Sequence, residues 1–208
     1  MSTENYVLAA RTQSRLNGIL YNYVDQSFFQ GKNVLEAGYG NPSAGPKLAE
    51  LGCTVTVWDN SQENLDAIKS AHPELTTQLV DLSTHVMQEK YTIIYSADAI
   101  FALPDPIAAV SSMLNNCDYL FIEAMAYDNM TDTETPYIDG GNGKFVSLVA
   151  VENAAKAAGF EYKMLTKDMD SDVWYGWAND GLDTKEARYS HHFMYLCWRN
   201  GVDSPLKA

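Results

Sequence analysis

The stretch from Asn33 to Asp59 reads NVLEAGYGNPSAGPKLAELGCTVTVWD, and it decides the fold. It opens with a short apolar run that stops at an acid, Glu36. A glycine-rich turn follows, with Gly38 and Gly40, and a helical pattern comes after it. Glycine has no Cβ, so a turn of this kind lets the backbone come close to a ligand. The pattern therefore predicts a strand, a ligand-binding turn and a helix.

A second β-branched run, Thr54 to Trp58, completes the unit and stops at another acid, Asp59. A strand, a glycine turn, a helix, a strand and an acid, in this order and spacing, are typical of nucleotide and nucleoside sites. A carboxylate at the end of the second strand can accept hydrogen bonds from the vicinal hydroxyls of a ribose. We therefore expect Asp59 to bind a ribose and the two glycines to lie against the same ligand.

The chain has 208 residues, of which 46% are hydrophobic and 20% charged, a composition typical of a globular protein. Its longest apolar runs, such as Val146 to Val151, are far too short to span a bilayer, and the first residues show no secretory signal. Cys53, Cys117 and Cys197 form no C-x-x-C motif, which argues against a disulfide scaffold and a zinc site. We expect a single domain over residues 1–208, no membrane association and a cytoplasmic location.

The formal net charge is -13, and the lysines and arginines are scattered along the chain. A phosphate backbone would be repelled by such a surface unless a local basic patch existed. The charge therefore argues against nucleic acid as a partner and favours a small molecule or a basic or neutral partner. The sequence leaves the oligomeric state open.

The first half of the chain alternates between predicted strands and predicted helices. Helices are expected within residues 5–24, after the glycine turn, and over about 60–71 and 105–114. Strands are expected at about 33–37, 53–58, 77–80, 91–95 and 118–123. Apolar strands of this kind are buried on both faces. The pattern predicts an α/β fold with a Rossmann-like, doubly wound sheet that is mostly parallel and has helices on both faces.

Polar or small residues stand at the predicted carboxyl ends of these strands: Glu36, Asp59, Asp81, Ser96-Ala97 and Glu123. In open α/β sheets, ligands bind beyond the carboxyl ends of the strands. We therefore expect these five positions to converge on one site.

The pattern changes after the fifth strand. Residues 127–144 combine glycines with acids and predict a long mobile loop, and a helix over about 147–158 is expected to end at Gly159. A strand is expected at about 161–165, a second loop at 168–187 and a final apolar strand at 191–198. This order predicts an antiparallel pair at the edge of the sheet.

Four short motifs give the chain a family resemblance. They are Glu36-Ala37-Gly38-Tyr39-Gly40, Asp59-Asn60-Ser61, Asp81-Leu82, and Ser96-Ala97 followed by Leu103-Pro104-Asp105-Pro106. In these motifs the chain resembles the class I S-adenosylmethionine-dependent methyltransferases, and the L-P-D-P sequence is more similar to their small-molecule branch. The resemblance covers about Val34 to Glu123. It departs from the family at Pro42, where many members carry a third glycine, and it includes no N/D-P-P-Y motif after the fourth strand.

The resemblance implies S-adenosylmethionine as cofactor and methyl transfer to a small-molecule acceptor. Asp59 would then bind the ribose, Asp81 the adenine amino group, the Leu82 N–H a ring nitrogen, and the backbone near Ala97 the methionine portion. The full set of expected cofactor residues is Glu36, Gly38, Gly40, Asp59, Asn60, Asp81, Leu82, Ser96 and Ala97. Residues 1–30 would form a helical cover, 31–126 the cofactor-binding half and 127–208 the substrate-side half.

Methyl transfer from a sulfonium needs positioning and desolvation more than a catalytic group, so the sequence names no catalytic residue. Candidates for a proton acceptor are Asp98, Glu123, His191 and His192. The two histidines are adjacent on a strand and should face opposite ways, which argues against a metal pair. Candidates for ligand contacts are Tyr6, Arg11 and Arg15 near the start of the chain, and the loop aromatics Trp174, Tyr175 and Trp177.

Two other functions fit the same β-α-β unit. A nicotinamide-dependent oxidoreductase would use it, although Ser43 stands where the dinucleotide fingerprint has a glycine and no Tyr-x-x-x-Lys pair follows. A non-catalytic binding protein on a methyltransferase-like fold is the other possibility, because a fold alone does not determine a function.

Overall fold

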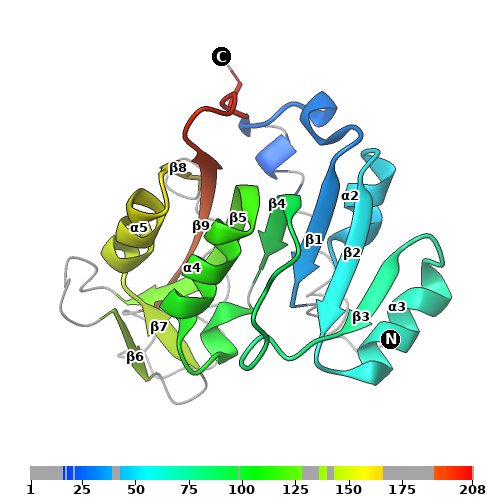
Figure 1. Cartoon of the computed structure of the whole chain (residues 1–208), viewed down its shortest axis with the longest axis horizontal. Coiled ribbons are helices and arrows are strands. Elements are labelled where there is room, and N and C mark those ends of the chain that lie inside the picture. Colours follow the sequence, from blue (N-terminus) through cyan, green and yellow to red (C-terminus); the bar gives the residue numbers. More distant parts are fainter. Residues whose placement is uncertain are drawn as a thin grey trace.

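The computed structural model describes residues 16, 18–20, 22–38, 43–97, 99–127, 136–139, 143–165 and 190–207. Its centre is a sheet whose first five strands are β1 (Asn33–Ala37), β2 (Thr54–Asp59), β3 (Thr76–Leu79), β4 (Tyr91–Ser96) and β5 (Cys117–Tyr127). These strands are parallel and lie in the order β3-β2-β1-β4-β5 (Figure 1). The predicted parallel sheet is confirmed.

The end of the chain adds an antiparallel pair to this sheet. β9 (Ser190–Arg199) pairs antiparallel with β5, and β8 (Phe160–Met164) pairs antiparallel with β9. The last strand in the sequence therefore lies between β5 and β8, and β8 forms the edge. This arrangement confirms the prediction of a mostly parallel sheet with an antiparallel final strand.

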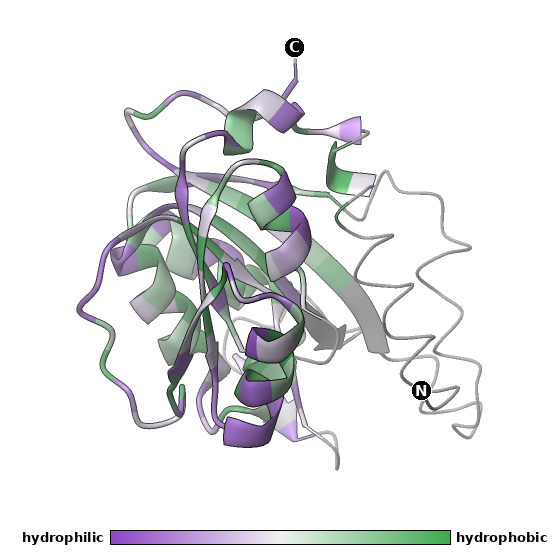
Figure 2. Ribbon diagram, turned by 90° about the vertical axis from the view of Figure 1, so that its right-hand side faces the viewer, coloured by the Kyte–Doolittle hydropathy of each residue, from purple (hydrophilic) through white to green (hydrophobic). Residues whose placement is uncertain are grey.

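Helices cover both faces of the sheet, as expected. Neighbouring residues of β1 point to opposite faces, so Val34 packs with α2 (Gly45–Glu50) and α3 (Gln62–Ala71), whereas Leu35 packs with α4 (Pro106–Asn115) and α5 (Leu148–Ala157). Leu16 and Ile19, in the helical stretch before β1, belong to the first of these two apolar clusters. Figure 2 shows that the flanking helices mix hydrophilic and hydrophobic residues, as helices between a core and solvent do.

Three of these helices begin at the side-chain caps that their sequences favour. Ser61 accepts a hydrogen bond from the N–H of Asn64, Asp105 from that of Ala108, and Ser147 from that of Ala150. Each such cap contributes about 1 kcal/mol to helix stability. No helix among the described residues is long and apolar enough to cross a membrane.

The predicted loop over residues 127–144 is wrong at both ends. β5 continues to Tyr127, and the hairpin of β6 (Tyr137–Asp139) and β7 (Lys144–Val146) occupies the C-terminal part. The hairpin is held by antiparallel pairing and by an ion pair of 2.6 Å between Lys144 and Asp139. Its strands are three residues long, which is too short for a clear alternating pattern in the sequence.

The crossover from β3 to β4 has no helix, although most parallel crossovers contain one. Residues 80–90 form a short turn at 82–84 and then a stretch without regular secondary structure. This crossover segment passes beside α4 (Figure 1). Two shorter 3-10 helices, η1 (Gln26–Phe29) and η2 (Ile100–Ala102), lie before β1 and after β4.

Candidate functional site

The glycine turn begins directly after β1. Gly38 has a φ of +81°, a conformation that side chains other than glycine rarely adopt. Its N–H donates a hydrogen bond of 3.1 Å to the carbonyl of Trp58, so the turn stays attached to the end of β2. A Cβ at this position would lie 2.4 Å from the Cβ of Ala99, which follows β4. Only glycine fits here, and the ends of β1, β2 and β4 meet at it.

Glu36 holds the far side of the turn. Its Oε1 accepts a hydrogen bond of 2.6 Å from the N–H of Ala44, and its Oε2 accepts one of 3.0 Å from the N–H of Gly45 and another from the Ser43 hydroxyl. Burial raises the pKa of Glu36, these three donors lower it, and the negative charge of Asp59 raises it again, with a net upward shift. Both carboxylate oxygens are thus used to anchor the start of α2.

Asp59 is the last residue of β2 and is only 7% exposed. Its Oδ1 accepts hydrogen bonds from the N–H of Ser61 at 2.8 Å and from the Asn64 amide at 3.2 Å. No hydrogen bond from the described residues ends on Oδ2. Asn60, between the strand and the helix cap, is exposed.

Asp81 and Leu82 follow β3 at the same edge. Asp81 is exposed, and its Oδ1 accepts hydrogen bonds from the hydroxyl and the N–H of Ser83, which lower the pKa of Asp81. Residues 82–84 form a turn. The Leu82 Cδ1 atom would lie 3.6 Å from a Cβ at Gly38, so Leu82 is a neighbour of the glycine turn.

Ser96 and Ala97 complete the edge. The Ser96 hydroxyl is buried and donates a hydrogen bond of 3.1 Å to the carbonyl of Ala37, which joins the ends of β4 and β1. Ala97 is partly buried against the apolar cluster on the α2 and α3 face. The structure therefore brings the predicted residues after β1, β2, β3 and β4 to one edge of the sheet.

Glu123 does not lie at the end of its strand, because β5 continues to Tyr127. It is fully buried within the sheet, at 0% exposure. His191 and His192 lie on β9, paired with Ala126 and Met125. The other sequence candidates lie outside the described residues: Tyr6, Arg11, Arg15, Gly40, Asp98, Trp174, Tyr175 and Trp177. Among the described residues, no three His, Cys, Asp or Glu side chains gather as metal ligands.

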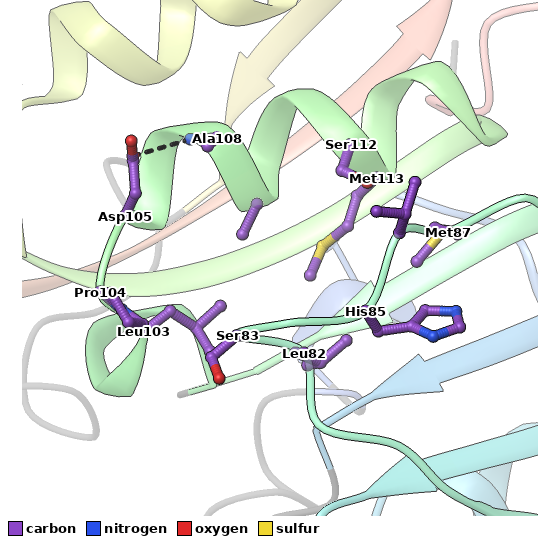
Figure 3. Close-up of a pocket in the computed structure, with 12 residues that line it drawn as sticks. Leu82, Ser83, His85, Met87, Leu103, Pro104, Asp105, Ala108, Ser112 and Met113 are labelled. Atoms are coloured by element: carbon purple, nitrogen blue, oxygen red, sulfur yellow. Dashed lines mark hydrogen bonds between the residues drawn. The ribbon is translucent and has the colours of Figure 1, made fainter.

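A groove of about 290 Å³ lies between the β3–β4 crossover and α4, and the sequence did not reveal it (Figure 3). Two of its polar side chains bind neighbours within the protein: Asp105 caps α4 at 2.9 Å, and the Ser83 hydroxyl binds Asp81. Its lining consists of Leu82, Ser83, His85, Val86, Met87, Leu103, Pro104, Asp105, Ala108, Ala109, Ser112 and Met113. One wall of the groove is the crossover, which has no helix, and Leu82 both lines the groove and neighbours Gly38.

The β6–β7 hairpin pairs with the last part of β5. Val146 pairs with Ala126 and is fully buried, so β7 continues the sheet past the point where β4 stops. A Cβ at Gly143 would lie 2.5 Å from the ring of Phe101, so the hairpin packs directly on η2. The segment that follows Ser96 and Ala97 is therefore in contact with the hairpin.

No protein-family model matches the chain, and no curated protein is similar to it in sequence. Solved structures are similar in fold. An S-adenosylmethionine-dependent methyltransferase from Mesorhizobium loti is 15% identical, with a TM-score of 0.61 over 82% of this chain and 92% of that one. The chain has the class I methyltransferase fold. Magnesium protoporphyrin IX methyltransferase from Synechocystis PCC 6803, crystallised with S-adenosylmethionine, is also 15% identical, with a TM-score of 0.60 over 94% of this chain and 80% of that one.

This methyltransferase fold also occurs in a protein with a different reaction in its name. The [4+2]-cyclase SpnF is 12% identical to the chain, with a TM-score of 0.61 over 82% of this chain and 76% of that one. Identities this low establish the shared fold and leave the activity to be argued from the site.

Proposed function

We propose that the chain is an S-adenosylmethionine-dependent methyltransferase that acts on a small-molecule acceptor. The observation that carries the proposal is the contact between the Gly38 turn and the end of β2, where the buried carboxylate of Asp59 stands. Structures of the same fold contain this cofactor or its product. The protoporphyrin methyltransferase was also solved with S-adenosylhomocysteine. The N-terminal domain of EvdMO1, 11% identical with a TM-score of 0.62 over 96% of this chain and 83% of that one, was solved with S-adenosylhomocysteine as well.

The residues at this edge fit the cofactor. Gly38 presents backbone without a side chain, and Asp59 keeps one carboxylate oxygen for a ribose hydroxyl. Glu36 would act on the ligand through the shape of the turn, because both of its oxygens already bind the start of α2. The remaining proposed contacts are those of the sequence prediction: Gly40, Asn60, Asp81, Leu82, Ser96 and Ala97.

When bound, S-adenosylmethionine supplies an electrophilic methyl group on a sulfonium. The chain then has to hold the acceptor in line with that methyl group and to exclude water. The packing of Gly143 on Phe101 places the β6–β7 hairpin beside the segment after β4, so we assign this hairpin to the wall of the acceptor site.

The first prediction tests the cofactor. S-adenosylhomocysteine is expected to raise the melting temperature of the protein, whereas NAD is not. A ligand present at 100 times its dissociation constant stabilises the folded state by about 2.7 kcal/mol. The measurement is thermal unfolding with each ligand over a concentration series. A shift with NAD and none with S-adenosylhomocysteine would contradict the proposal.

The position of Ser43 fits a nicotinamide-dependent oxidoreductase less well than a methyltransferase. The Ser43 hydroxyl binds Glu36 and also accepts a hydrogen bond of 2.9 Å from the N–H of Gly45, so a side chain fills the place of the fingerprint's glycine. A non-catalytic binding protein on this fold is the other alternative, because a fold alone does not determine a function. Transfer of a labelled methyl group to small-molecule acceptors separates that case from a methyltransferase.

The proposal includes a cytoplasmic location. All three cysteines are described, and Cys53, Cys117 and Cys197 are free thiols. Free thiols of this kind are usual in a reducing compartment.

A further inference from the structure

A small hydrogen-bond network surrounds Asp59 at the start of α3. The Asn64 side-chain amide donates to Asp59 Oδ1 at 3.2 Å, and the N–H of Ser61 donates to the same oxygen at 2.8 Å. The N–H of Asn64 in turn donates to the Ser61 hydroxyl at 3.3 Å, which is the cap of the helix. Asn64 therefore uses its backbone for the cap and its side chain for the carboxylate two residues before the cap.

This network restricts the carboxylate of Asp59. The Ser61 N–H and the Asn64 amide both donate to Oδ1, so the carboxylate cannot rotate without losing one of these hydrogen bonds. In this orientation Oδ2 points away from the two donors. The next residue, Leu65, is 2% exposed and packs in the core, so the first turn of α3 that carries Asn64 is itself fixed. A binding group that is held in place before the ligand arrives loses less conformational freedom on binding.

We propose that Asn64 is a positioning residue for the cofactor's ribose, which it orients by holding Asp59 through Oδ1 so that Oδ2 accepts from a ribose hydroxyl. The inference rests on the proposed function, because it takes the ligand of Asp59 to be a nucleoside. It adds a residue that touches the carboxylate and not the ligand. The motif that produces it is acid, x, serine, x, x, asparagine, over residues 59–64.

The test compares two ligands on one variant. Asn64→Ala is expected to weaken binding of S-adenosylhomocysteine about threefold to tenfold, as measured by calorimetric titration. The same variant should bind an analogue that lacks both ribose hydroxyls as tightly as the wild-type protein does, because Asp59 has no partner on that analogue. Asn64→Asp should weaken S-adenosylhomocysteine further, since it replaces a donor with a second negative charge beside Asp59.

Gln62 provides the matched control. It lies in the same turn of α3, and its amide donates to Asp66 at 2.8 Å, so Gln62→Ala removes an amide that does not contact Asp59. This variant should bind both ligands like the wild type.

Three outcomes would overturn the inference. Unchanged affinity of Asn64→Ala for S-adenosylhomocysteine would show that Asp59 needs no positioning. An equal loss for both ligands would show a general disturbance of α3. No binding of S-adenosylhomocysteine by the wild-type protein would remove the proposed function first, and this inference with it.

Discussion

Gly38→Ala is expected to abolish binding of S-adenosylhomocysteine and to lower the melting temperature. The added Cβ would lie 2.4 Å from the Cβ of Ala99, so the segment after β4 has to move away from the turn. The φ of +81° at this position adds a cost of about 1–2 kcal/mol for any L side chain. Both effects fall on the turn that is proposed to meet the ligand. Calorimetric titration measures the binding, and thermal unfolding measures the stability.

The variant Gly31→Ala separates the steric clash with Ala99 from the cost of the positive φ. Its φ is +73°, but nothing lies within 4 Å of a Cβ built there. Gly31→Ala should therefore show the backbone cost alone, with a lower melting temperature and unchanged ligand binding. If Gly38→Ala stays folded and binds S-adenosylhomocysteine like Gly31→Ala does, the turn does not approach the ligand.

Asp59→Asn is expected to weaken binding of S-adenosylhomocysteine at least tenfold. Asparagine can still accept through Oδ1, so the bonds from Ser61 and Asn64 persist, while Oδ2 is replaced by an amide group that donates. A hydrogen bond to a charged acceptor is worth about 1.5–3 kcal/mol, and every 1.4 kcal/mol is about tenfold in affinity. Calorimetric titration gives the loss, and thermal unfolding should show a much smaller effect than for Gly38→Ala.

Asp66→Asn is the control for the change in net charge. Asp66 is an exposed carboxylate on α3 whose contact is the amide of Gln62. It carries the same charge as Asp59 but stands away from the carboxyl edge of the sheet. Equal affinities for the two variants would mean that the carboxylate of Asp59 is a structural group and does not bind a ribose.

Much of the site was predictable because its signals are local. Gly38 follows β1 and Asp59 ends β2, and the apolar runs in the sequence predict where both strands end. The sequence analysis did not predict that Glu36 holds the start of α2, although the donors of its three hydrogen bonds lie only seven to nine residues further on. Asn64 was also missed, because an amide in the first turn of a helix is unremarkable until its partner is known. The sequence singled out Leu82 and the Leu103-Pro104-Asp105 motif separately, but only the fold brings them together as walls of the groove beside α4.

The sequence by itself determined the order of the five parallel strands and of the helices between them, the glycine turn and the acid at the end of β2. These depend on periodicity, on backbone freedom and on neighbouring residues, which act over short distances along the chain. Only the tertiary structure decided that Ala99 packs against Gly38 and that Ser96 donates a hydrogen bond to the Ala37 carbonyl, 59 residues away along the chain. It also decided that β9 lies between β5 and β8 and that the β6–β7 hairpin packs on Phe101. Such contacts depend on which strands become neighbours, and the pairing of distant segments is set by the whole sheet and not by any one of them.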